Sequence, residues 1–217
     1  MMIQFDQVSK RYAGGIEALH QVNFSMDRGE MVFLTGHSGA GKTTFLKLIA
    51  KLQSPSSGQL VVNNIQLNAL KKHQIPTYRS QLGIIFQSPS LLHDRTVFDN
   101  VALPLQIQGL HSTLIPKRVR AALDMVNLLN KEKMYPIQLS AGEQQRIGIA
   151  RAVVHKPALV LADEPTGNLD PSLSLGIMRL FEQFNQVGVS VLIVTHDLAL
   201  IAGMRHRIVM LKGGAVC

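Results

Sequence analysis

The chain has 217 residues, of which 46% are hydrophobic and 17% charged, a composition typical of a folded globular protein. No apolar run approaches the roughly 20 residues that span a bilayer, the start lacks the organisation of an export signal, and Cys217, the single cysteine, excludes an internal disulfide. We therefore expect one cytoplasmic domain, 1–217. Its net charge of +8 suits an anionic partner such as a nucleotide, a nucleic acid or phospholipid headgroups.

The first part of the chain alternates between apolar and polar residues. This alternation covers residues 3–8 and 19–26, with a glycine-containing turn at 13–15 between them, and predicts two antiparallel strands. A turn is expected at 55–58 and a further strand at 59–62. Together these segments predict an antiparallel β subdomain near the N-terminus.

A segment between a strand at 31–34 and a helix fits the pattern G-x-x-x-x-G-K-[ST], which binds the phosphates of a nucleoside triphosphate. Its glycines let backbone N–H groups turn toward the phosphates, and the positive end of the following helix faces the same anion. Lys42 then reaches the terminal phosphates, and Thr43 ligates Mg²⁺. The predicted nucleotide contacts of this loop are Gly36, His37, Ser38, Gly39, Ala40, Gly41, Lys42, Thr43 and Thr44. The helix is expected to present Phe45, Leu48, Ile49 and Leu52 on one face.

The stretch that follows the next strand, 82–86, differs in character from the rest of the chain. Residues 88–156 show no comparable strand pattern, and they contain amphipathic runs that begin near Pro116 and after Ser140. We expect a helical subdomain of approximately 88–156 inserted into an α/β core. At the end of the strand before it, Gln87 is a candidate ligand of Mg²⁺ or of water that reports the nucleotide state to the insertion; the alternative is a solvated glutamine.

The core resumes with a strand at 158–162, a helix that ends near Gly188, and a strand at 189–194. The first of these strands delivers two carboxylates to the edge where open α/β sheets bind ligands. Asp163 is predicted to hold Mg²⁺ through its hydration shell, and Glu164 to polarise the attacking water as general base. Taken without the phosphate loop, such a pair of acids is more typical of solvated or capping residues.

His196 closes the last long strand in the same way, so its imidazole is expected beside the terminal phosphate. There it would hydrogen bond the γ-phosphate and orient water, although a lone histidine is more often structural. Ser140 and Glu143 fit the capping box S-x-x-E, which predicts a helix start. A helix start with a serine hydroxyl and the N–H of Gly142 is also a second phosphate site. Since the chain has one phosphate loop, this second site suggests a nucleotide held by another copy.

These motifs in this order, with Asn168-Leu169-Asp170 after the paired acids, resemble the ATP-binding-cassette (ABC) ATPases across essentially the whole chain. The resemblance implies an α/β fold, a P-loop NTPase core of ABC type with an N-terminal antiparallel β subdomain and an inserted helical subdomain. It also implies a homodimer packed head to tail, with Ser140 and Gly142 of one subunit on the γ-phosphate held by Lys42 of the other. The segment 168–170 would cross that interface.

The resemblance assigns two further positions. Tyr12 matches the aromatic residue that stacks on adenine; the alternative is a half-buried strand tyrosine. The family usually has Gly where Ala141 stands, and a methyl group is tolerated there only if the backbone keeps a negative φ.

Within the family, residues 93–102, 150–154 and 179–185 look like cell-division ATPases. This implies a Mg-ATPase at the cytoplasmic face of the inner membrane that works with an integral membrane protein, and with cytoplasmic division proteins, to control peptidoglycan hydrolysis at the septum. The alternative is the ATPase subunit of a lipoprotein-releasing or macrolide-export transporter, which shares the 163–170 pattern.

The surface that would meet the membrane partner is expected within 88–104. Five apolar residues in this stretch are expected to be partly exposed and to form that surface, namely Leu91, Leu92, Val97, Phe98 and Val101. The alternative is that they are ordinary core residues of a helix. A nucleotide-dependent binding module that barely hydrolyses is a competing hypothesis, and Glu164 argues against it because a binding switch needs no base. No nucleic acid is expected, because a DNA-associated cassette needs a long coiled-coil insertion for which the spacing leaves no room.

Overall fold

A six-stranded sheet forms the centre of the protein in the computed structural model, which describes every residue of 1–217 except Asn168. Its order is β10-β9-β3-β8-β7-β6, and its strands run parallel except for β10. The strands are β3 (Met31–Thr35), β6 (Leu82–Ile85), β7 (Leu159–Asp163), β8 (Ser190–Val194), β9 (Arg207–Lys212) and β10 (Ala215–Val216). Every residue of β3 and β8 is buried, as expected of a parallel sheet covered on both faces. The four core strands predicted from the sequence are confirmed to within two residues at each end.

A second, antiparallel sheet of order β2-β1-β4-β5 confirms the predicted N-terminal β subdomain. It consists of β1 (Ile3–Arg11), β2 (Glu17–Met26), β4 (Ser57–Val62) and β5 (Ile65–Gln66). The turn predicted at 55–58 is wrong in its second half, because β4 already begins at Ser57. Gly58 has a φ of +83°, and a side chain there would collide with the carbonyl of Gln7 on β1. A glycine that the sequence pattern marks as a turn is therefore a close strand contact.

Helix α1 (Lys42–Ile49) joins the two sheets. The ring of Phe45 stacks on Phe5 of β1 at 4.2 Å between centroids and meets Phe24 of β2 edge-on at 5.2 Å. Leu48 and Ile49 share this buried face, as predicted. Leu52 does not, because the helix ends before it and leaves its side chain 40% exposed.

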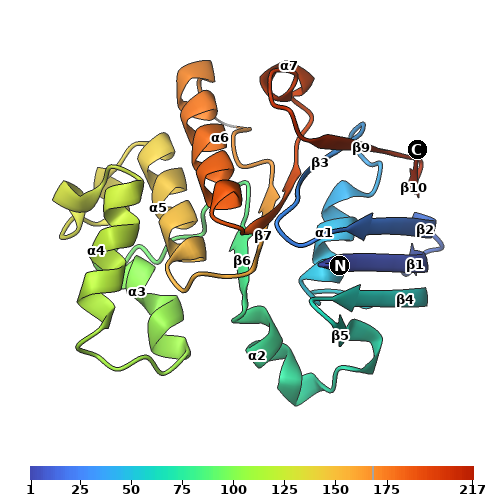
Figure 1. Cartoon of the computed structure of the whole chain (residues 1–217), viewed down its shortest axis with the longest axis horizontal. Coiled ribbons are helices and arrows are strands. Elements are labelled where there is room, and N and C mark those ends of the chain that lie inside the picture. Colours follow the sequence, from blue (N-terminus) through green and yellow to red (C-terminus); the bar gives the residue numbers. More distant parts are fainter. Residues whose placement is uncertain (168) are drawn as a thin grey trace.

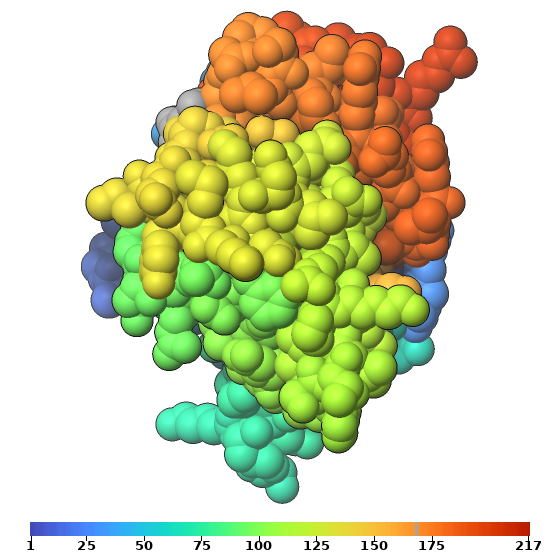
Figure 2. Space-filling model, turned by 90° about the vertical axis from the view of Figure 1, so that its left-hand side faces the viewer, coloured from blue at the N-terminus to red at the C-terminus, as the bar shows by residue number. Residues whose placement is uncertain are grey.

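The residues between β6 and β7 form a cluster of helices beside the core (Figure 1; Figure 2 shows its outer face). It contains α3 (Val97–Ile107), α4 (Ile115–Met125), η3 (Leu129–Lys131), η4 (Pro136–Gln138) and α5 (Ala141–Val153). Of the five residues expected to be exposed for docking, Leu91, Val97 and Val101 are instead buried in the core of this cluster. Leu92 is exposed, and Phe98 is partly buried against the same core.

The remaining helices lie outside this cluster. They are η1 (Leu67–Ala69), η2 (Lys72–Gln74), α2 (Ile75–Arg79), α6 (Pro171–Gln186) and α7 (Leu198–Ile201). The sequence pattern predicts α6 but not α2. Ile177, Phe181 and Phe184 lie on the buried face of α6, and Leu180 is partly buried beside them. No helix in the described part of the chain has the length and hydrophobicity that crossing a lipid bilayer requires.

Candidate functional site

The phosphate loop connects the end of β3 to the first residue of α1. Two of its glycines are required by their surroundings. Gly36 has a φ of +146° and Gly41 a φ of +104°, and a side chain would strike the carbonyl of Leu211 at the first and that of Ala18 at the second. This packing against neighbouring strands holds the loop in the conformation that turns its amides inward.

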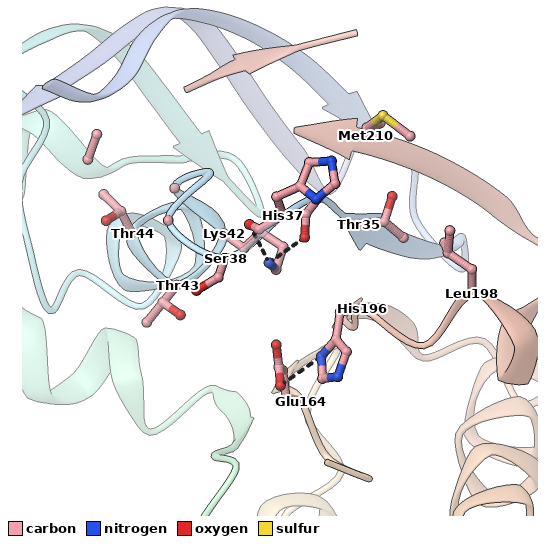
Figure 3. A pocket seen from close by; sticks show the side chains of 14 residues that line it. Thr35, His37, Ser38, Lys42, Thr43, Thr44, Glu164, His196, Leu198 and Met210 are labelled. Carbon is pink, nitrogen blue, oxygen red and sulfur yellow. Dashed lines mark hydrogen bonds and ion pairs between the residues drawn. The ribbon is translucent and has the colours of Figure 1, made fainter. Parts of the chain in front are cut away.

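Lys42 lies over this loop rather than extending into solvent (Figure 3). Its Nζ atom donates hydrogen bonds to the carbonyls of Gly36 at 2.6 Å and His37 at 3.0 Å, and the residue is 7% exposed. Both partners are neutral, so the ammonium keeps a positive charge available to an anion at the same place. A desolvated cation beside inward-facing amides is suited to bind phosphate.

The loop forms one wall of a cavity of about 670 Å³. Glu164 and His196, from the ends of two other core strands, form the facing wall (Figure 3). Most of the predicted loop residues line the cavity, namely Gly36, His37, Ser38, Gly39, Gly41, Lys42, Thr43 and Thr44; Ala40 is buried behind them. The volume is in the range of cofactor sites.

Glu164 and His196 are in direct contact. The Nδ1 atom of His196 lies 3.0 Å from Oε2 of Glu164. The contact follows from the topology, because β7 and β8 are parallel neighbours and the residues after their last positions lie side by side. Glu164 has a φ of +46°, unusual for a residue with a side chain, and its N–H donates to the carbonyl of Val194 at 2.9 Å. The backbone is thus held where the carboxylate leaves the strand direction and faces the cavity.

Asp163 ends β7 in a different environment from its neighbour. Burial raises the pKa of Asp163 above its usual value, and the adjacent charge of Glu164 adds to the rise, whereas the Thr43 hydroxyl and Lys47 oppose it. Asp163 and Thr43 together line a small cavity next to the main one. Their carboxylate and hydroxyl are oxygen ligands of the kind Mg²⁺ prefers.

Within the described residues, no three His, Cys, Asp or Glu side chains converge to form a complete metal site. Mg²⁺ commonly uses one or two protein ligands and completes its shell with waters and substrate phosphates, so Thr43 and Asp163 fit this ion once a nucleotide is present. The third predicted ligand, Gln87, is exposed just beyond β6 and does not line the phosphate-loop cavity. Its amide nitrogen lies beside Gly167, in the loop that follows Glu164.

Tyr12 stands near the cavity without lining it. Its hydroxyl is 3.3 Å from the side-chain oxygen of Thr44, a residue of the cavity wall, and the Nζ atom of Lys10 lies 5.1 Å from the centre of its ring. The ring is half-buried next to the phosphate loop, and its stacking on adenine stays a prediction.

The predicted capping box is present at the start of α5. Ser140 Oγ accepts the N–H of Glu143 at 3.3 Å, and Glu143 Oε2 accepts the N–H of Ser140 at 3.1 Å. The other carboxylate oxygen of Glu143 is paired with Lys131, which is the main cause of its lowered pKa. Both carboxylate oxygens of Glu143 are therefore used to stabilise the N-terminus of α5. Ala141 opens the helix with a negative φ, so its methyl group is accommodated.

Ser140, Gly142 and Glu143 do not line the phosphate-loop cavity. One copy of the chain thus brings together the loop, Glu164 and His196, but not the second predicted phosphate site.

Some residues around these sites could not be identified from the sequence. Ala18, Thr35, Leu198 and Met210 also line the cavity, and Lys131 supports Glu143. They belong to no motif, and only the strand order and the helix packing bring them to the sites.

Comparison with known proteins gives consistent matches over the chain. A family model described as "ABC transporter" matches residues 19–167. The chain is 58% identical over 213 residues to the cell division ATP-binding protein FtsE of Escherichia coli (strain K12), covering 98% of this chain and 96% of that protein. It is 41% identical to the protein of the same name from Bacillus subtilis (strain 168), with 99% and 94% covered.

Among solved structures, the dimeric post-hydrolysis state of the ATP-binding cassette MJ0796 bound to ADP and Pi has a TM-score of 0.91 at 36% identity, with 99% of this chain and 96% of that chain covered. The phosphate loop, the strand-end acids and these full-length similarities agree, and the chain belongs to the ABC transporter family of ATP-binding cassettes.

Proposed function

We propose that this protein is the Mg-ATP-hydrolysing subunit of a bacterial cell-division ABC complex. The observation that carries the proposal is the placement of Glu164, held by His196, across one cavity from Lys42. The full-length similarity to proteins named FtsE, in bacteria as distant as Escherichia coli and Bacillus subtilis, supports the cell-division role over the transporter alternative. We treat residues 1–217 as one ABC ATPase domain with a helical subdomain at approximately 88–156.

In the proposed reaction, the loop amides and Lys42 hold the β- and γ-phosphates, and Tyr12 stacks on adenine. Glu164 accepts a proton from the attacking water, while His196 orients the Glu164 carboxylate and contacts the γ-phosphate. Thr43, Asp163 and Gln87 are the residues that would hold Mg²⁺, and the bound ion would neutralise developing phosphate charge. The adjacent carboxylates thus have separate roles, one toward metal and one toward water.

The active unit is proposed to be a head-to-tail homodimer. Ser140 and Gly142 lie outside the cavity of their own chain, so a γ-phosphate reaches them only from a second copy. The dimeric state of MJ0796 with ADP and Pi supports this arrangement. Each pocket would then combine Lys42 and Glu164 of one subunit with the α5 start of the other.

An integral membrane protein of the FtsX type is the proposed partner, holding this subunit at the cytoplasmic face of the inner membrane. The burial of Leu91, Val97 and Val101 moves its docking surface away from most of 88–104. Leu52 and Phe86 are 40% and 43% exposed and flank the small cavity that also contains Asp163. A helix of the partner seated on these two side chains would sense the Mg²⁺ site and Gln87 directly.

The test is Glu164→Gln, which keeps the shape of the side chain but removes the base. We expect turnover to fall about 10²- to 10⁴-fold, because that is the usual contribution of a general base, and the ATP-bound protein to accumulate as a dimer measured by light scattering. Glu182→Gln, on α6 away from the cavity, is the matched control and should turn over normally. Native turnover by Glu164→Gln would refute the base assignment.

A further inference from the structure

The charge of this chain is unevenly distributed. Between Glu30 and Asp94 there is no acidic residue, and six basic residues fall in that interval: Lys42, Lys47, Lys51, Lys71, Lys72 and Arg79. Lys42 belongs to the phosphate loop, and the others have no part in the proposed reaction. The segment 71–79, here called the basic spur, contains three of them and consists of η2 and α2.

The basic spur is fixed to the end of α1. Arg79 donates from Nε to the carbonyl of Ala50 at 3.2 Å and from Nη2 to that of Lys51 at 2.7 Å. The Tyr78 hydroxyl donates to the carbonyl of Ile49. These bonds satisfy carbonyls at the C-terminus of the helix, and they hold the spur in a defined position next to Leu52.

The tip of the spur points its cations outward. Lys71, Lys72 and His73 are exposed, and none of the ion pairs among the described residues involves them. The turn is closed by Gln74, whose Oε1 accepts the N–H of Lys71 at 2.9 Å and whose N–H donates to the carbonyl of Lys71 at 2.9 Å. In both overall views this segment projects from the lower edge of the molecule (Figures 1 and 2).

We propose that the basic spur binds the anionic phospholipid headgroups of the membrane in which the partner is embedded. The inference rests on the proposed function, because the spur is bonded to Ala50 and Lys51 and so lies beside Leu52, on which the membrane-embedded partner is proposed to dock. A convex tip with unpaired lysines fits a layer of mobile anionic headgroups better than a single directed ion pair. The spur exposes no Phe, Tyr or Trp ring, because Tyr78 is 3% exposed, so it lacks the stacking surface that single-stranded nucleic acids usually bind.

The strength of this contact follows from the number of charges. Each Lys or Arg near an anionic membrane surface strengthens binding about fivefold, and the effect weakens as salt shortens the screening distance. Two exposed lysines therefore give weak binding, measurable with anionic vesicles in excess at low salt, and in the complex they orient the subunit on a membrane to which its partner holds it.

The experiment is flotation of the full chain with vesicles of phosphatidylglycerol and phosphatidylcholine, compared with vesicles of phosphatidylcholine alone. We expect binding only to the anionic vesicles, with a fraction that falls as salt is added. The double variant Lys71→Glu, Lys72→Glu should weaken binding about thirtyfold or more. The matched control is Arg205→Glu, Lys212→Glu, two exposed residues of the C-terminal region, which lowers the net charge of +8 by the same four units and should bind nearly as well as the native chain.

Equal loss in the two double variants would overturn the proposal, since net charge rather than the spur would then govern binding. Absence of binding by the native chain, or its displacement from vesicles by duplex DNA at matched phosphate concentration, would overturn it as well. ATP hydrolysis by the Lys71→Glu, Lys72→Glu variant should equal that of the native chain. The trapped Glu164→Gln dimer tests the proposed function separately, so failure of one proposal is distinguishable from failure of the other.

Discussion

Asp163 and Glu164 are adjacent in the sequence, yet the fold gives their carboxylates different surroundings. Asp163 continues the strand into a partly buried position beside Thr43, whereas Glu164 turns at a positive φ toward the phosphate loop and His196. The pair was predicted from the strand pattern. The contact between Glu164 and His196 was not, because it depends on β7 and β8 being neighbours in the sheet.

The raised pKa of Asp163 leads to a prediction about stability. A carboxyl group whose pKa is higher in the folded than in the unfolded state stabilises the fold at low pH, and that contribution is lost as pH rises through the folded value. At neutral pH the charged form is therefore unfavourable. We expect Asp163→Asn to raise the free energy of unfolding by about 1 kcal/mol at neutral pH, the size of gain seen when strained functional residues are replaced.

Thermal unfolding measured across pH checks this expectation. The gain should disappear in acid, where Asp163 of the native protein is protonated in both states, and Mg-dependent hydrolysis should be lost at all pH values. A lower melting temperature of Asp163→Asn than of the native protein at neutral pH would contradict burial as the main influence on the pKa of Asp163.

At the scale of elements, two glycines affect helix α6 in different ways: Gly188 ends it, and Gly176 lies within it. Gly188 follows the helix with a φ of +91°, and the N–H groups of Gly188 and Val189 donate to the carbonyls of Asn185 and Phe184. This is the left-handed termination expected from the sequence. Gly176 lies inside the same helix, where an added methyl group would meet nothing within 4 Å.

Replacing glycine by alanine should therefore have opposite effects on the free energy of unfolding at these two positions. Gly176→Ala should stabilise the protein by about 0.5–1 kcal/mol, because alanine loses less backbone entropy in a helix. Gly188→Ala should destabilise it by about 1 kcal/mol or more, because alanine is strained at that φ. Denaturant titration of both variants provides the comparison, and a loss of stability in Gly176→Ala would show that the site is less open than the structure indicates.

At the scale of the whole molecule, one chain contains two parts of a catalytic site that do not meet. The phosphate-loop cavity includes Lys42, Glu164 and His196, and the start of α5 with Ser140 lies outside it. The proposed homodimer joins these parts in trans. This dependence on a second copy can be tested by mixing inactive variants.

Lys42→Ala removes the phosphate-binding ammonium, and Ser140→Arg obstructs the α5 start; each should be inactive alone. In a mixed dimer packed head to tail, one pocket receives both defects and the other receives none. Equal mixing should therefore restore up to about a quarter of the native ATPase rate. If no activity returns although mixed dimers are detected by native mass spectrometry, the two parts do not act in trans.

The sequence by itself determined those features that depend on short-range geometry. Local sterics and hydrogen bonding between residues a few positions apart suffice to specify them. They are the phosphate loop, the capping box of Ser140 and Glu143, and the strands that end at Asp163 and before His196. The tertiary structure alone decided the order of the strands and the contact of Glu164 with His196. It also decided which apolar side chains are covered: Leu91, Val97 and Val101 are buried, whereas Leu52 and Phe86 are exposed. Which face of a helix or strand is buried depends on packing against elements far away in the sequence, and hydrophobic periodicity does not identify those elements.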